Sequence, residues 1–149
     1  MQNQLIAKNK KAYHNYHILD EIETGIVLVG TEVKALREHR VSLTDSFARI
    51  QNGEVWLENC HISAYKKGNR ENHLPKRRRK LLLHRREINK LWGKVSLKGL
   101  TLVPLSLYFK NGKAKMKIAV AKGKKTFDKR EVKRRKIIDR EIDEQLRGK

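Results

Sequence analysis

The sequence has 149 residues, of which 36 are Lys or Arg and 16 are Asp or Glu, so the formal net charge is +20 and the pI is near 10.3. This length fits one ordinary domain plus a tail, and a surface this positive repels itself unless a polyanion neutralises it, which makes nucleic acid the first candidate partner. The single cysteine excludes an internal disulfide, and no segment approaches the roughly 20 apolar residues of a membrane span, so a cytoplasmic protein is expected.

The excess charge lies in the second half of the chain. Residues 1–75 contain 10 Lys or Arg and 9 Asp or Glu, whereas residues 76–149 contain 26 and 7. Such asymmetry indicates contact with nucleic acid or with an anionic membrane. The sequence offers no apolar anchor, and this disfavours the membrane.

The first half of the chain predicts strands followed by a short helix. A strand pair is expected over residues 16–29, with Gly25 at a bend or bulge. A helix is expected after Gly30, with Thr31 as its N-cap, because a threonine hydroxyl accepts hydrogen bonds from the amides of the first turn.

Two Asn-Gly pairs, Asn52-Gly53 and Asn111-Gly112, predict β-hairpins, because both residue types tolerate the positive φ of a tight turn. Ahead of the second turn, Pro104 lacks an amide donor, so its strand is expected at an edge or bulged. The residues expected to share one apolar face of that strand are Val103, Leu105, Leu107 and Phe109. After the turn, period-two alternation predicts a lysine row made of Lys113, Lys115 and Lys117.

A longer helix is predicted from about His84 to Lys98, with Gly99 at its end. Its apolar stripe, expected to be buried, consists of Ile88, Leu91, Trp92 and Val95. The run Lys76–Lys80 just before it is the densest charge cluster. We interpret this run as a phosphate contact, with a solvated loop as the alternative.

Residues 1–121 are predicted to form the folded body and residues 122–149 a basic tail. The tail contains 12 Lys or Arg and 6 Asp or Glu, and its apolar stripe is too thin for a core. We expect it to be disordered when free and helical on its partner.

Many short strands with inserted helices and a basic sheet face predict a mainly β fold, a small antiparallel barrel of the OB type. Tyr13, Tyr16 and Tyr65 are candidates for base stacking, whereas Trp92 and Phe109 are expected in the core. No zinc-ligand spacing, phosphate-binding loop or nucleophile–base pair is recognisable, so we expect neither a metal, nor a cofactor, nor catalysis.

Four sequence blocks occur in a specific order over about residues 8–130. They are Asn9–Ala12, Gly30–Arg37, Arg79–Leu83 and Ala121–Lys125, and Asp128-Lys129-Arg130 follows the last. As an ordered set they resemble the family of bacterial SsrA-binding proteins, also called small protein B (SmpB).

The resemblance implies an adaptor of trans-translation. Such an adaptor binds the tRNA-like part of transfer-messenger RNA (tmRNA, also called SsrA RNA), which is delivered in a complex with elongation factor Tu to stalled ribosomes. Its tail occupies the decoding centre of the small subunit and the empty mRNA channel.

The resemblance, carried over position by position, and the lysine row together imply the predicted site residues, and Glu23 is among those that the resemblance implies. For RNA binding they are Asn9, Lys10, Glu23, Glu32, Lys34, Arg37, Arg79, Lys80, Leu82, Lys113, Lys115 and Lys117. For the decoding-centre tail they are Gly123, Lys124, Lys125, Phe127, Asp128, Lys129 and Arg130.

Two positions depart from what the resemblance implies. Phe127 stands where the family usually has a polar aromatic residue or a histidine, which keeps a stacking surface but loses a hydrogen-bonding group. His39 stands where the family usually has glycine after the first helix, so a left-handed turn there is expected to be strained or absent.

Two other function classes remain open at this point. A ribosomal or ribosome-assembly protein would share the charge, the small barrel and the tail, but would stay on ribosomes through a salt wash. An enzyme that acts on RNA is disfavoured because no acid–base or metal constellation is visible.

Overall fold

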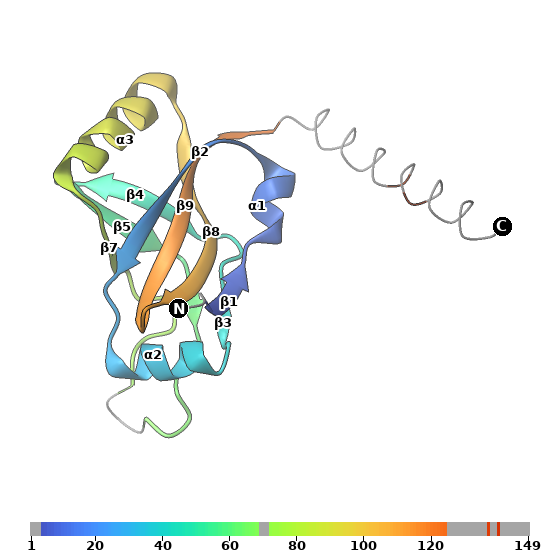
Figure 1. The fold of residues 1–149 in the computed structure, drawn as a ribbon, viewed down its shortest axis with the longest axis vertical. Helices are drawn as coiled ribbons and strands as arrows, with labels where there is room; N and C mark the ends of the chain where they lie inside the picture. Colours follow the sequence, from blue (N-terminus) through green and yellow to red (C-terminus); the bar gives the residue numbers. More distant parts are fainter. Residues whose placement is uncertain (1–3, 69–71, 125–136, 138–139, 141–149) are drawn as a thin grey trace.

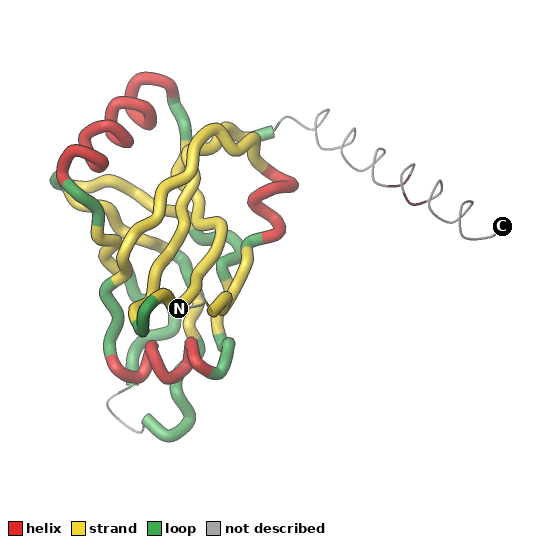
Figure 2. Tube along the Cα trace, in the orientation of Figure 1, coloured by secondary structure: helices red, strands yellow, loops and turns green. Residues whose placement is uncertain are grey.

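The structure, a computed structural model, describes residues 4–68, 72–124, 137 and 140. Figures 1 and 2 show strands that form the wall of a barrel with helices outside it. The described strands are β1 (Gln4–Lys8), β2 (Tyr16–Ile26), β3 (Val41–Ser42), β4 (Phe47–Gln51), β5 (Glu54–Glu58), β6 (His61–Ile62), β7 (Arg79–Leu82), β8 (Thr101–Lys110) and β9 (Lys113–Gly123). The described helices are α1 (Lys10–Asn15), α2 (Gly30–Arg37) and α3 (Arg85–Lys98).

Six strands close into a ring. The sheet order is β1-β8-β4-β5-β7-β2-β9, and an additional β8–β9 pairing closes a ring of β8, β4, β5, β7, β2 and β9; every pairing is antiparallel. β1 lies beside β8 outside the ring, and β3 and β6 form a separate small sheet. The predicted mainly β barrel with inserted helices is confirmed.

Both predicted hairpins are present. Asn52 and Gly53 have φ of 53° and 75°, and Asn111 and Gly112 have φ of 53° and 76°, so all four adopt the left-handed conformation that the turns need. The turns connect β4 to β5 and β8 to β9. These local signals were therefore sufficient to place two of the ring's strand pairings, β4–β5 and β8–β9.

The predicted single apolar face of β8 is wrong. The β8–β9 register shifts between Pro104 and Ser106, which confirms the predicted bulge. Because a one-residue shift reverses the face that follows, Val103 and Leu105 lie outside the barrel and Leu107 packs inside it. Pro104 does not mark an edge, since β8 pairs on both sides.

Residues 16–29 were also predicted wrongly as a strand pair. They hold one long strand, β2, which pairs first with β9 and then also with β7. Gly25 lies where β2 pairs with both neighbouring strands, because it is opposite Lys115 of β9 and Leu82 of β7. The glycine therefore allows a close approach between strands and forms no turn.

The barrel has an inner core and an outer apolar cluster. The inner core includes Val55, Leu57, Met116 and Ile118, all fully buried. The outer cluster packs Ala12 of α1 against a part of the sheet, and its other buried members are Val103, Leu105, Ala119 and Ala121. One outer sheet face is therefore basic toward the β8–β9 turn and covered by α1 at its other end.

Two helices lie at opposite ends of the barrel (Figure 1). α2 buries Ala35 and Leu36 completely, and its N-cap is Val29, not the predicted Thr31. α3 is capped by His84, whose amide donates to the Glu87 side chain at 2.9 Å, and it ends at Gly99 with φ of 62°.

The structure decides two expectations for helix residues: the burial of Trp92 is wrong, and of the two alternatives for the turn at His39, strained or absent, the absent one is excluded. Trp92 was predicted in the core but is 53% exposed, because α3 crosses the barrel end with only Leu91 fully buried. His39 does adopt the left-handed conformation, with φ of 58°. The amides of His39 and Arg40 donate to Leu36 and Ala35 in a Schellman pattern, and His39 Nδ1 lies 3.1 Å from the Ile6 carbonyl oxygen.

Candidate nucleic-acid interface

The outer face of β7, β2, β9 and β8 brings together several of the predicted RNA-binding residues. We call it the Glu23 face, and its members are Glu23, Leu82, Tyr108, Lys110 and Lys115. Lys115 lies opposite Tyr108 on one side and Gly25 on the other, and Gly25 in turn lies opposite Leu82. The residues come from four strands, so only the closed sheet assembles them.

Glu23 is held as a charged acceptor. The Tyr108 hydroxyl donates to its carboxylate, and Lys110 Nζ lies 3.4 Å away. The Tyr108 hydrogen bond is the largest of the causes that lower the pKa of Glu23 below its ordinary value, and Lys110 and Lys115 act in the same direction. Burial and the adjacent carboxylate raise the pKa of Tyr108, so Tyr108 remains a donor at neutral pH. Glu23 is thus ionised and oriented, with lone pairs left for a ligand.

The Glu23 face also presents an apolar surface. Leu82 is 51% exposed, and a Cβ atom placed on Gly25 would lie 3.2 Å from the Leu82 Cβ atom. The bare glycine therefore leaves room for Leu82 on the sheet. An exposed leucine beside cations and a carboxylate can contact bases or sugars while the charged groups bind polar atoms.

Further cations border this face. Lys113 is exposed, Lys117 Nζ lies 3.8 Å from a Glu21 carboxylate oxygen, and Lys80 Nζ lies 3.3 Å from a Glu54 carboxylate oxygen. The predicted lysine row is therefore present and partly neutralised by acids of neighbouring strands.

The basic run Lys76–Lys80 mostly contacts the protein itself. Arg77 binds Glu32, and Arg78 binds Glu58 at 3.1 Å and lies 4.5 Å from the Trp56 ring centre. Arg79 is completely buried. Phosphate contact by this run stays a prediction, and its exposed members Lys76 and Arg78 are the ones available for it.

Glu32 and Arg79 do not lie on the RNA-facing surface where they were predicted. Both side chains are fully buried and form an ion pair. Arg79 also donates to the carbonyl oxygens of Cys60 at 2.7 Å and Pro75 at 3.1 Å, while Glu32 accepts from the Val29 amide at 2.9 Å. Glu32 and Arg79 therefore belong to a buried network that joins α2 to β7, and this explains their place in the sequence blocks. Neither side chain is exposed to an RNA.

The other predicted residues separate into exposed and structural groups. Lys10 is exposed on α1, Arg37 is exposed on α2, and Lys34 lies 5.5 Å from the Tyr65 ring centre. Asn9 is buried as the N-cap of α1, with its Oδ1 accepting from the Ala12 amide at 3.2 Å and its Nδ2 donating to the Pro104 carbonyl at 2.9 Å. Asn9 therefore positions α1 and has little left for a ligand.

The predicted decoding-centre tail is described only at its start. Gly123 is the last residue of β9, and the Lys124 amide donates to the Asn15 carbonyl at 2.8 Å. Lys125, Phe127, Asp128, Lys129 and Arg130 lie outside the described residues.

Sequence reasoning missed Tyr108 and Lys110 as members of this face. Period-two alternation could have found them, because Leu107 and Phe109 pack on the inner side of β8 and Tyr108 and Lys110 therefore lie on the outer face with Lys115. Within residues 4–68 and 72–124, no group of three or more His, Cys, Asp or Glu is placed to hold a metal ion. No described helix is long and apolar enough to cross a membrane.

Comparison with known proteins places these features in one family. The family model for the SmpB protein matches residues 6–148. The SsrA-binding protein of Carboxydothermus hydrogenoformans is 60% identical over 98% of both chains, and that of Geobacter sulfurreducens is 54% identical over 100% of this chain and 97% of its own. A solved structure described as "tmRNA-SmpB: a journey to the center of the bacterial ribosome" has a TM-score of 0.68 and 52% identity, covering 80% of this chain and 85% of its own. The chain therefore belongs to the SmpB family of SsrA-binding proteins.

Proposed function

We propose that this protein is an RNA-binding adaptor of trans-translation. It binds the tRNA-like part of tmRNA and delivers it, in a complex with elongation factor Tu, to stalled ribosomes in the cytoplasm. Its tail then occupies the decoding centre and the empty mRNA channel. It catalyses no reaction and needs no cofactor.

The Glu23 face is the observation that supports this function best. Lys110 and Lys115 supply positive charge for phosphates, which gives affinity without sequence preference. The oriented Glu23 carboxylate is an acceptor, so it favours the exposed amino groups of unstacked bases and repels a regular phosphate backbone. A folded RNA elbow presents both features, whereas a plain duplex presents phosphates alone.

The substitution Lys115→Ala is expected to lower affinity for the tRNA-like part of tmRNA about tenfold and to reduce the slope of log affinity against log salt by about one. Glu23→Ala is expected to lower the same affinity without a change in salt slope, because it removes an acceptor and no cation. Fluorescence anisotropy from 50 to 400 mM salt measures both quantities.

Lys66→Ala is the matched control for charge, since Lys66 is exposed and lies outside the Glu23 face. If Lys66→Ala weakens elbow binding as much as Lys115→Ala, net charge and not this face determines binding. Thermal unfolding of Glu23→Ala should stay near that of the wild type, because the ion pair of Glu23 with Lys110 is partly exposed and such pairs contribute little to stability. The same measurement on Lys115→Ala and Lys66→Ala checks that these variants are folded.

A further inference from the structure

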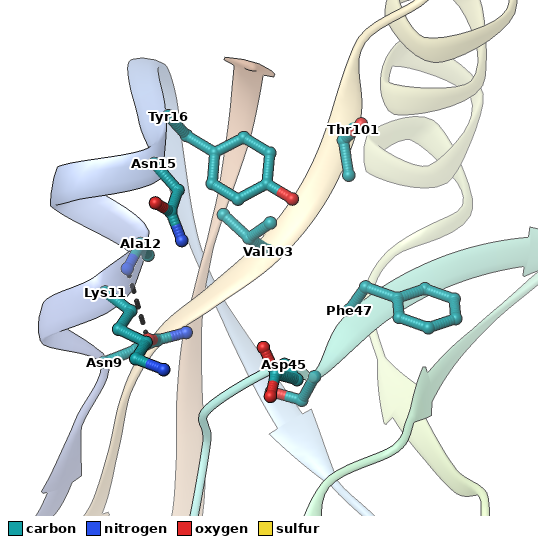
Figure 3. A pocket seen from close by; sticks show the side chains of 10 residues that line it. Asn9, Lys11, Ala12, Asn15, Tyr16, Asp45, Phe47, Thr101 and Val103 are labelled. Carbon is teal, nitrogen blue, oxygen red and sulfur yellow. Dashed lines mark hydrogen bonds between the residues drawn. The ribbon is translucent and has the colours of Figure 1, made fainter. Parts of the chain in front are cut away.

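A pocket of about 260 Å³ lies between α1, β8 and the start of β4, away from the Glu23 face (Figure 3). Tyr16 at its rim pairs with Gly123, eight residues along β9 from Lys115, which corresponds to roughly 26 Å. Residues that line it include Lys11, Asn15, Tyr16, Asp45, Phe47 and Val103. It is therefore a separate site on the molecule.

Buried hydrogen bonds fix the walls of this pocket. Asn9 donates to the carbonyl oxygens of Pro104 and Leu43, and Ser46 Oγ donates to the Leu43 carbonyl at 2.5 Å. Asp45 is held with φ of 63°, and its carbonyl oxygen accepts from Asn59 Nδ2 at 3.0 Å. A strained residue that is held in this way beside a pocket is often functional.

The polar groups in the pocket are available for a ligand. The side-chain carboxamide of Asn15 and the carboxylate of Asp45 both line the pocket. Among the described residues, neither of these side-chain groups has a hydrogen-bond or ion-pair partner. Tyr16 and Phe47, the latter 39% exposed, add aromatic rings to the lining, and Lys11 adds a cation (Figure 3).

We propose that this pocket binds one unstacked guanine base of an RNA. Aromatic rings stack on any base, and a carboxylate accepts two parallel hydrogen bonds from the N1–H and N2–H donors of guanine. Adenine, cytosine and uracil each offer Asp45 a single donor group on the corresponding edge. Lys11 then lies near the phosphate of the same nucleotide.

The position of the pocket indicates which RNAs can reach it. The Lys124 amide donates to the carbonyl of Asn15, so the tail leaves the barrel beside the pocket. An RNA that receives the tail, or the tmRNA that the barrel carries, can supply the guanine. The inference shares with the proposed function only the premise that the ligand is RNA.

Single-stranded pentanucleotides test this site directly. We expect the full-length protein to bind UUGUU about tenfold more tightly than UUAUU, UUCUU or UUUUU in fluorescence anisotropy. Asp45→Asn should abolish that preference, because asparagine keeps the left-handed backbone but replaces one carboxylate oxygen by a donor. Phe47→Ala should weaken all four RNAs, and Phe47→Tyr should retain wild-type binding.

Lys115→Ala is the control for the other face and should leave the guanine preference intact. Absence of a guanine preference, or a preference that survives Asp45→Asn, overturns the proposal. If either result occurs while the tRNA-like part of tmRNA still binds normally, the pocket proposal fails and the proposed function stands.

The source of the guanine is resolved by two further titrations of Asp45→Asn, one with the tRNA-like part of tmRNA and one with purified small ribosomal subunits. Weaker binding to either RNA identifies that RNA as the source and supports the site. Unchanged binding to both shows that neither RNA uses the pocket and overturns the inference.

Discussion

Deletion of residues 125–149 is expected to abolish tagging of stalled translation products while the barrel stays folded and keeps most of its affinity for tmRNA. The cut follows Lys124 because β9 runs to Gly123 and the Lys124 amide still donates to Asn15. The buried core ends at Ala121, so the deletion removes no core side chain that the structure describes. The two activities should therefore separate.

A reconstituted tagging assay at saturating tmRNA measures this effect, with anisotropy and thermal unfolding of the same variant as controls. Full tagging by the truncated protein would exclude the tail from the mechanism.

Within the full-length chain, Phe127→Ala should impair tagging, because a stacked base contact is typically worth about 1–3 kcal/mol. Phe127→His should restore most of the tagging activity in the same assay.

Glu32→Ala is expected to destabilise the protein by about 3–5 kcal/mol, the usual cost of leaving a buried charge without its partner. The fully buried Arg79 would lose the one carboxylate with which it pairs among the described residues, and the Val29 amide at the start of α2 would lose its acceptor. Chemical denaturation followed by circular dichroism gives the free energy of unfolding.

Glu54→Ala is the matched control, because the Glu54–Lys80 pair is 44% and 40% exposed and pairs of this kind contribute about 0–1 kcal/mol. Equal losses from Glu32→Ala and Glu54→Ala would show that the buried network does not determine stability. Elbow affinity of the folded fraction should be unchanged by Glu32→Ala, since Glu32 has no exposed surface.

The effect of Glu32→Ala should depend on pH. Burial alone would raise the pKa of Glu32, but hydrogen bonds from Arg77 and the Val29 amide, together with Arg79, outweigh burial and lower the pKa below its ordinary 4.5. A carboxyl whose pKa is lowered on folding contributes stability above its unfolded pKa and loses it as the pH falls through its folded pKa. The difference in unfolding free energy between wild type and Glu32→Ala should therefore shrink below about pH 4.5.

Local signals in the sequence determined much of the architecture. The Asn-Gly turns and the helix from Arg85 to Lys98 follow from backbone preferences and periodicity, which act over a few residues. The lysine row also follows from period-two alternation, because no bulge interrupts β9 between Lys113 and Lys117. The ordered sequence blocks identified the family without any structure.

Only the tertiary structure decided which residues form each surface. The bulge after Pro104 reverses the faces of β8, so Val103 and Leu105 lie outside the barrel while Leu107 lies inside it, and spacing along one strand does not show this. Glu32 and Arg79 are 47 residues apart in the sequence, which predicts them as surface charges. In the structure α2 and β7 bury them as an ion pair. Burial and strand register depend on partners distant in sequence, and these partners exist only once the barrel has closed.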